Sequence, residues 1–298
     1  MIIVNKFGGG ILNGAVPIKH LLKIFKSFSP EDSTINVFSA FGKTTNALEK
    51  IAKTCQGGEF AESEKLLKDL ESFHKAIALE LFPEKHAIFL TIENEFKKIK
   101  EKFPLSGQAE GLQFIDQILP HGEILATMII GNYLEHAGIP NKLISAIDFL
   151  QTDSSFGSAS VDKSATGKNL KAQTRDEIFN PHKNIITEGF VGFSGKWMTT
   201  LGREGSDYTA GLLGNLLSAG KVVLWKDVPG VMENNPKISG NKNAKKIDFL
   251  TYSQLDGLLQ DVARGLVHPK TLKEVKEKGI PLQIRPFWEI DSPGTLID

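Results

Sequence analysis

The chain has 298 residues, of which 41% are hydrophobic and 23% are charged. These values are ordinary for a globular protein, and the length suffices for one large domain or two lobes around a buried core. Lys plus Arg and Asp plus Glu both total 35, so the overall charge does not favour binding to nucleic acid or to an anionic membrane. The single cysteine, Cys55, excludes an internal disulfide and lies on a predicted helix, which favours a buried thiol in a reducing compartment.

The N-terminal residues, Met1 to Lys6, form only a short apolar run that ends at a lysine. A secretory signal would need a basic start and a longer apolar segment, so we expect none here. No run approaches the roughly 20 consecutive apolar residues that a membrane helix requires. The sequence therefore predicts a cytoplasmic protein.

Short apolar runs alternate with glycine-rich or polar loops in the N-terminal region. Residues 2–5 predict a buried strand that leads into the glycine loop 8–10, residues 16–28 predict an amphipathic helix, and residues 35–38 predict a second strand. This order is typical of a βαβ unit and a largely parallel sheet. Ligands of such sheets bind at the carboxyl ends of the strands, where both loops would lie.

The loop after the second predicted strand contains Gly42-Lys43-Thr44, which is similar to the end of a P-loop. A P-loop would also need glycine at position 37, where this chain has Val37. We therefore reject a P-loop nucleotide site. None of the seven histidines has a metal-ligand spacing, so no metal ion held by protein side chains is expected.

The remainder of the chain alternates predicted helices and strands. Helices are expected over most of 46–137, and the segment 152–168 is expected to be a loop or hairpin. Further strands are predicted at 143–146, 185–191, 221–225 and 280–285. A capping box, Thr251 with Gln254, predicts one late helix, and Pro269 begins another that stops at Gly279.

The most informative stretch runs from Thr199 to Ala210, where a glycine-punctuated loop leads into a segment with apolar residues at helical spacing. Ser206 is expected to be the N-cap of this helix, with Asp207 in its first turn. Backbone N–H groups, the Arg203 guanidinium and nearby hydroxyls would then converge on a place suited to an anion.

A set of short motifs follows one order along nearly the whole chain. They are Lys6-Phe7-Gly8-Gly9, Ser39-Ala40 with Thr45-Asn46, Gly122-Glu123, Thr152-Asp153 with Phe156-Gly157-Ser158-Ala159, Gly189-Phe190-Val191-Gly192, and the segments 200–210, 225–230, 280–285 and 293–297. Each motif is weak alone, but the ordered set resembles the aspartokinases of the amino acid kinase family.

The resemblance implies an α/β protein with a three-layer αβα amino acid kinase fold around a mainly parallel central sheet. It implies a single domain over residues 1–298, with an amino-acid-binding lobe at about 1–195, a nucleotide-binding lobe at about 196–298, and no ACT regulatory domain. The implied reaction is ATP-dependent phosphorylation of the L-aspartate side chain to 4-phospho-L-aspartate, the first step towards aspartate-derived amino acids. Mg²⁺ would bind with the nucleotide, and a homodimer would be a possible assembly of the chain.

The resemblance also assigns roles to residues that match the family motifs. Lys6 and Asp207 would be catalytic, Lys6 at the transferring phosphate and Asp207 orienting the cationic groups. The substrate-binding residues would be Ser39, Thr45, Glu123, Arg203 and Ser206, with Arg203 at the α-carboxylate and Glu123 at the α-ammonium. The nucleotide-binding residues would be Lys6, Gly8, Gly9, Lys226, Asp227, Met232, Lys237 and Arg264.

Several positions depart from the family pattern. Gly10 and Ile11 replace Thr-Ser, and Glu204 places a carboxylate beside Arg203, where it either points to solvent or pairs with the guanidinium. The nucleotide-side replacements are Met232, Asn235, Lys237 and Gly265, with Arg264 as a candidate substitute for the family's lysine. Two alternatives therefore stay open: an enzyme for another small carboxylate, or a non-catalytic ligand-binding or partner subunit with a degenerate ATP site.

Overall fold

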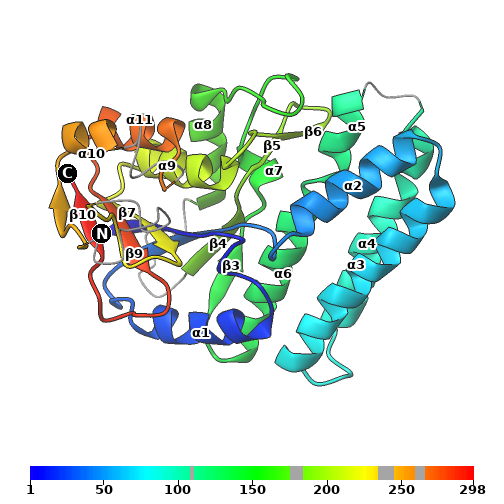
Figure 1. Cartoon of the computed structure of the whole chain (residues 1–298), viewed down its shortest axis with the longest axis horizontal. Helices are drawn as coiled ribbons and strands as arrows, with labels where there is room; N and C mark the ends of the chain where they lie inside the picture. Colours follow the sequence, from blue (N-terminus) through cyan, green and yellow to red (C-terminus); the bar gives the residue numbers. More distant parts are fainter. Residues whose placement is uncertain (108–110, 175–183, 234–244, 259–265) are drawn as a thin grey trace.

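The computed structural model describes residues 1–107, 111–174, 184–233, 245–258 and 266–298. Within these residues, an eight-stranded sheet lies between two layers of helices (Figure 1). In order across the sheet, the strands are β3 (Asn141–Leu143), β4 (Asn184–Glu188), β2 (Ser33–Phe38), β1 (Ile2–Phe7), β7 (Lys221–Lys226), β9 (Leu282–Pro286), β10 (Thr295–Ile297) and β8 (Phe249–Leu250). Every neighbouring pair is parallel except β9 with β10, which confirms the expected fold class.

The helices divide between the two faces of the sheet. One core contains residues of α1 (Ala15–Lys26), α2 (Thr44–Gln56), α3 (Phe60–Leu81), α4 (Ile88–Glu101), α5 (Gly111–Ile118) and α6 (His121–His136). The other core contains residues of α7 (Ala146–Phe149), α8 (Lys163–Thr174), α9 (Gly205–Leu217), α10 (Tyr252–Leu258) and α11 (Pro269–Glu277). Figure 1 shows α1 on one side of the sheet and α9 with α11 on the other.

The central strands are apolar on both faces because both faces are covered. In β7, Val222 and Leu224 belong to the core under α9, whereas Val223 and Trp225 belong to the core under α1. This alternation follows from the two-residue period of a strand, and it explains why the strands read as continuous apolar runs.

A chain of hydrogen-bonded polar side chains crosses four strands of the sheet, and all of them are buried except the half-buried Asn184. Trp225 Nε1 donates to Asn5 Oδ1 at 3.1 Å, and Asn5 Nδ2 donates to Asn36 Oδ1 at 3.1 Å. Asn36 Nδ2 donates to Thr34 Oγ1 at 2.8 Å, and the Thr34 hydroxyl donates to Asn184 Oδ1 at 2.8 Å. These polar groups thus satisfy one another from β7 through β1 and β2 to β4, and we call them the amide ladder.

Three expectations about the bounds of local structure are wrong. The segment 152–168, expected to be a loop or hairpin, has an antiparallel bridge between Thr152 and Val161, but its last residues belong to α8, which begins at Lys163. The predicted strand 185–191 ends at Glu188, because Phe190 adopts a left-handed φ of 71° and turns the chain into the hairpin of β5 (Val191–Phe193) and β6 (Met198–Thr200). Strand β3 lies at 141–143, slightly before the predicted 143–146.

The predicted helix boundaries in the C-terminal region are confirmed where they are described. The backbone N–H of Thr251 donates to Gln254 Oε1 at 2.8 Å, and the N–H of Gln254 donates to Thr251 Oγ1 at 3.2 Å, which completes the capping box. Pro269 is the first residue of α11. Within the described ranges, none of the helices combines the length and apolar composition needed to span a membrane.

Candidate active site

The carboxyl ends of the central strands meet the N-terminus of α9 at one edge of the sheet. Gly189, just after β4, packs so closely on this helix that a Cβ there would lie 2.5 Å from the Cβ of Ser206. Only glycine permits this approach. The Gly189-Phe190 motif therefore places the first turn of α9 against the sheet edge.

Ser206 does not cap α9, contrary to the sequence-based expectation. The helix begins at Gly205, and Glu204 precedes it in a left-handed conformation with φ 57°. Ser206 is instead a buried residue of the first turn. The cause is the tight turn at Gly202, where the N–H of Gly205 donates to the Gly202 carbonyl at 3.0 Å and starts the helix early.

Asp207, which also belongs to the first turn of α9, lies between two lysines that come from strands of the sheet. Lys6 Nζ, at the end of β1, is 2.5 Å from Asp207 Oδ1, and Lys226 Nζ, at the end of β7, is 2.8 Å from Asp207 Oδ2. The exposed fractions of the side chains are 9% for Lys6, 17% for Lys226 and 3% for Asp207, so these ion pairs are largely shielded from solvent. We call these three residues the Asp207 cluster.

The ionisation of the Asp207 cluster is set by burial and by mutual attraction. Burial opposes ionisation of Asp207, but the charges of Lys6 and Lys226 outweigh it and lower the pKa of Asp207 to about 2. Burial lowers the pKa of Lys6 from its usual value, while Asp207 acts in the opposite sense. Two cations share one carboxylate, so the cluster has an excess of positive charge at the edge of the sheet.

The side chain of Lys226 was not anticipated in the Asp207 cluster. Its backbone was expected near a nucleotide, and the sequence showed only a lysine at the end of a predicted strand. The register explains its position, because β1 and β7 are parallel neighbours with Lys6 opposite Leu224, two residues before Lys226. Lysines at the ends of adjacent parallel strands are a signal that could have been used.

A cleft with a volume of about 670 Å³ opens beside the Asp207 cluster, within the usual size range of small-molecule sites. We call it the substrate cleft. Its walls include all of the predicted substrate-binding residues, Ser39, Thr45, Glu123, Arg203 and Ser206. These residues come from the end of β2, from α2 and α6, and from the loop before α9 with its first turn, so the fold brings together side chains far apart in sequence.

Glu123 is the most strongly perturbed group of the substrate cleft. Its side chain is buried, and the Thr45 hydroxyl donates to Oε1 at 3.2 Å, whereas Oε2 has no hydrogen-bond partner among the described residues. Burial, with a contribution from the charge of Glu188, raises the pKa of Glu123 to about 8. A buried carboxylate with one acceptor atom free suits a cationic group of a ligand.

Arg203 has the opposite properties to Glu123. It is exposed at the mouth of the cleft, and neither Arg203 nor the adjacent Glu204 forms an ion pair with a residue that the structure describes. Pairing between these two neighbours, one of the two possibilities raised by the sequence, is therefore not observed. The guanidinium is available for a bidentate contact with a carboxylate.

Asp116 is a cleft residue that the sequence analysis missed. From α5, its Oδ2 accepts hydrogen bonds from the N–H of Gly157 at 2.8 Å and of Thr200 at 3.0 Å, and its Oδ1 accepts from the Thr200 hydroxyl at 2.8 Å. Asp116 thus fixes the end of β6, three residues before Arg203. Its position inside an apolar helical segment was the only signal in the sequence.

The glycine loop after β1 has packing reasons for its composition. A Cβ at Gly8 would lie 2.9 Å from Lys6 Nζ, and a Cβ at Gly9 would lie 2.6 Å from the Ala40 carbonyl oxygen. Ile11, which replaces a family hydroxyl, is buried in the core under α1. The loop therefore leaves room for the Lys6 ammonium and packs on the end of β2.

Of the described residues predicted for the nucleotide, Gly9 lines the substrate cleft and the others do not. Asp227 is exposed directly after β7, and Met232 is half-buried and forms an isolated bridge with Lys246. Lys237 and Arg264, together with the altered positions Asn235 and Gly265, lie outside the described residues.

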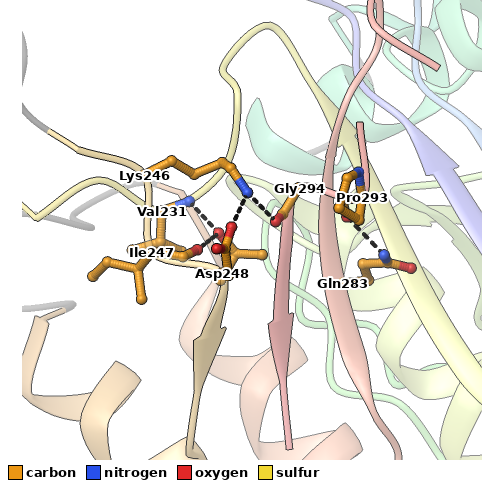
Figure 2. A network of polar contacts seen from close by, with 8 residues as sticks. Val231, Lys246, Ile247, Asp248, Gln283, Pro293 and Gly294 are labelled. Atoms are coloured by element: carbon orange, nitrogen blue, oxygen red, sulfur yellow. Dashed lines mark hydrogen bonds and ion pairs between the residues drawn. The ribbon is translucent and has the colours of Figure 1, made fainter. Parts of the chain in front are cut away.

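The segment that carries Met232 is tied to the edge of the sheet, as Figure 2 shows for Val231, Lys246 and their neighbours. The N–H of Val231 donates to Thr295 Oγ1 at 2.8 Å, and the N–H of Ile247 donates to the Val231 carbonyl at 2.8 Å. Lys246 Nζ donates to Asp248 and to the Gly294 carbonyl. Residues in or next to β8 and β10 thus hold the segment around Val231 and Met232 in place.

No group of three or more His, Cys, Asp or Glu side chains with metal-binding geometry occurs in the part of the chain that the structure describes. A divalent cation at this site would need most of its oxygen ligands from a bound phosphate compound and from water, which is usual for Mg²⁺.

The comparisons with known proteins agree with the geometry. The model of the amino acid kinase family matches residues 1–286. Aspartokinase 1, chloroplastic, of Arabidopsis thaliana is 31% identical over 99% of this chain and 51% of its own length, and lysine-sensitive aspartokinase 3 of Escherichia coli is 28% identical over 99% of this chain and 64% of its own length. The chain thus spans between about half and two thirds of these relatives.

A solved structure extends the similarity to three dimensions. The crystal structure of E. coli aspartokinase III in complex with aspartate and ADP superposes with a TM-score of 0.87 at 27% identity. The match covers 100% of this chain and 64% of the other. The architecture of the sheet and helices is therefore common to both chains.

Proposed function

The chain belongs to the amino acid kinase family, and on that premise we propose that it transfers the γ-phosphoryl group of ATP to the side-chain carboxylate of L-aspartate. The proposal draws on the aspartokinase relatives and on the solved aspartokinase that holds aspartate and ADP. The product would be 4-phospho-L-aspartate, which enters the aspartate-derived amino acid pathway.

One observation carries the proposal: among the described residues, the substrate cleft contains an unpaired buried carboxyl group and an unpaired guanidinium beside a buried cationic cluster. Among the residues that the structure describes, Oε2 of Glu123 has no hydrogen-bond partner and Arg203 forms no ion pair. An amino acid bound through its α-ammonium at Glu123 and its α-carboxylate at Arg203 would satisfy both groups. Ser39, Thr45 and Ser206 would complete the contacts.

The Asp207 cluster would serve the transfer step. Phosphoryl transfer needs alignment of the two substrates and neutralisation of charge on the moving group. Lys6 would contact the transferring phosphate, Lys226 would add a second positive charge, and Asp207 would hold both ammonium groups in place. Bound Mg²⁺ would neutralise charge on the nucleotide phosphates.

We propose that the nucleotide lies against the loop after β7, in the C-terminal lobe at about 196–298, and reaches the glycine loop after β1. Gly8 and Gly9 would provide close backbone approach, and Asp227 and Met232 would border the nucleotide. Lys237 and Arg264 are proposed to contact it on the basis of their motif positions alone. A homodimer and a cytoplasmic location are further parts of the proposal.

The proposed reaction is tested by acyl phosphate formation from Mg·ATP and L-aspartate, with hydroxylamine as the trap. We expect a hydroxamate signal that requires both ATP and L-aspartate. A signal with another carboxylic amino acid but not with aspartate would favour the shifted-substrate alternative. The absence of any signal, together with no ATP binding by calorimetry, would favour the non-catalytic alternative.

A further inference from the structure

A second cleft, with a volume of about 630 Å³, lies apart from the substrate cleft. It is lined by different faces of α5 and α6, and no described residue lines both clefts. The hairpin β5–β6 separates them, with Met198 in the wall of the second cleft and Thr200 in the wall of the substrate cleft. The proposed aspartate kinase reaction makes no use of this cleft.

One wall of the second cleft contains a buried polar atom that has no hydrogen-bond partner among the described residues. His121 Nδ1 is 2.6 Å from Glu95 Oε1, and both side chains are almost fully buried. Nε2 of the same ring is buried and has no hydrogen-bond partner among the described residues. Such an atom costs free energy unless a ligand or water satisfies it, so this wall is suited to a polar group.

Some of the charged groups that line the second cleft are already paired, and others are not. Glu95 already pairs with Lys98, at 2.9 Å, and has a hydrogen bond to His121, and Glu101 is 3.9 Å from Lys97. These contacts satisfy two of the lining carboxylates from within α4 and from the start of α6. The charges left for a ligand come from other residues.

Two of those residues are lysines and one is a glutamate. Lys102 is half-buried and forms no ion pair within the described ranges, and Lys196 Nζ lies 5.0 Å from the centre of the Trp197 ring. Glu188 accepts a hydrogen bond from the Ala146 N–H at 2.7 Å, and burial raises its pKa to about 7, so its negative charge is incomplete near neutral pH. The cleft therefore has an excess of positive charge.

The other side chains that line the cleft are mostly apolar. They are Ile124, Met128, Leu143, Ile147, Phe193, Trp197 and Met198. Apolar walls with a few polar and cationic groups are the usual composition of a small-molecule site. From the lining and the charge excess we infer that the second cleft binds a small organic anion, with its carboxylate at Lys102 and Lys196 and its apolar body against these walls.

The inference is tested on the whole chain with 3-phenylpropionate as the anionic probe and 3-phenylpropan-1-ol as its neutral counterpart. Binding is followed by the indole N–H signal of Trp197 in an ¹⁵N NMR spectrum, assigned with Trp197→Phe. We expect a saturable shift with the acid and roughly fivefold weaker binding of the alcohol, the size expected for partly exposed ion pairs. The signals of Trp225 and Trp288 report whether the fold is intact.

A double variant, Lys102→Met with Lys196→Met, should bind the acid and the alcohol equally, because methionine keeps the apolar stem and removes the charge. Lys68→Met is the matched control, since Lys68 is exposed on α3, lines neither cleft and should leave the preference intact. The inference is overturned if Trp197 does not respond, if the alcohol binds as tightly as the acid, or if L-aspartate displaces the probe, which would place it in the substrate cleft.

Discussion

The substrate cleft and the Asp207 cluster hold their ionisable groups in opposite ways. In the cleft, Glu123 and Arg203 make no ion pair with a described residue, and burial drives the Glu123 carboxyl towards its neutral form. In the cluster, Asp207 contacts two lysines and stays ionised. Unpaired groups gain the most interaction free energy when a ligand binds, whereas paired groups already have a fixed orientation before it binds. The cleft therefore suits binding, and the cluster suits the stabilisation of charge during transfer.

The largest expected effect is on turnover and comes from the cluster. Lys6→Ala should lower kcat by ~10²-fold or more, because it removes a preoriented cation from the transfer site. Lys226→Met should cost about tenfold, since Lys226 is the more exposed of the two cations. Steady-state kinetics with both substrates at saturation measure this, and Lys19→Ala, on the exposed face of α1, is the control. Turnover at the parent level in Lys6→Ala would refute the role of the cluster.

Arg203→Lys should act on binding instead of turnover. The variant keeps the charge but loses the planar fork, so KM for L-aspartate should rise by about 10- to 100-fold, with kcat changed much less. The ratio of the two effects sharpens the comparison between cleft and cluster. A loss confined to kcat would show that Arg203 acts in transfer and that the separation is wrong.

The pH dependence of aspartate binding should follow Glu123. Its pKa is about 8 in the free protein, so pairing with an ammonium group requires loss of a proton, and KM should fall by up to about tenfold per pH unit as the pH rises towards 8. Glu123→Gln should abolish this slope. KM measured between pH 6.5 and 8 checks it.

The same raised pKa has a consequence for stability with a definite sign. The folded protein holds the Glu123 proton more tightly than an unfolded chain, where the pKa is about 4.3, so its contribution to stability falls as the pH rises from about 4.3 to about 8. Urea unfolding at several pH values should show a shallower decline in Glu123→Gln. An unchanged slope would mean that Glu123 is already ionised in the free protein.

The smallest effect on the kinetic constants is expected at Asp116, which has no ion pair with Lys6 or Lys226. Asp116→Ala leaves two backbone N–H groups without their acceptor, and should destabilise the fold by roughly 2–5 kcal/mol and raise KM modestly. Asp116→Asn should restore most of the stability and bring KM to within about threefold of the parent. Its amide can accept from the N–H groups and donate to the Thr200 hydroxyl. Thermal unfolding and KM together test it, and failure of the asparagine to rescue would show that the charge itself matters.

The fold and most of the cleft could be predicted from the sequence, because apolar periodicity and ordered motifs depend on local spacing. The five residues assigned to substrate line one cleft. The side-chain position of Lys226 could not be read locally, since it depends on which strands become neighbours. Asp116 was missed because its partners, Gly157 and Thr200, are distant in sequence. The Ser206 cap was wrong because the turn at Gly202 starts the helix earlier.

The amide ladder has a consequence for the accuracy of the site. Asn5 directly precedes Lys6, and their side chains leave opposite faces of β1. A slip of β1 by one residue would strand the amides of Asn5 and Asn36 in an apolar interior and exchange the faces of Asn5 and Lys6. The hydrogen bonds of the ladder thus favour one register of β1 over the register shifted by one residue. The same register brings the ammonium group of Lys6 to Asp207.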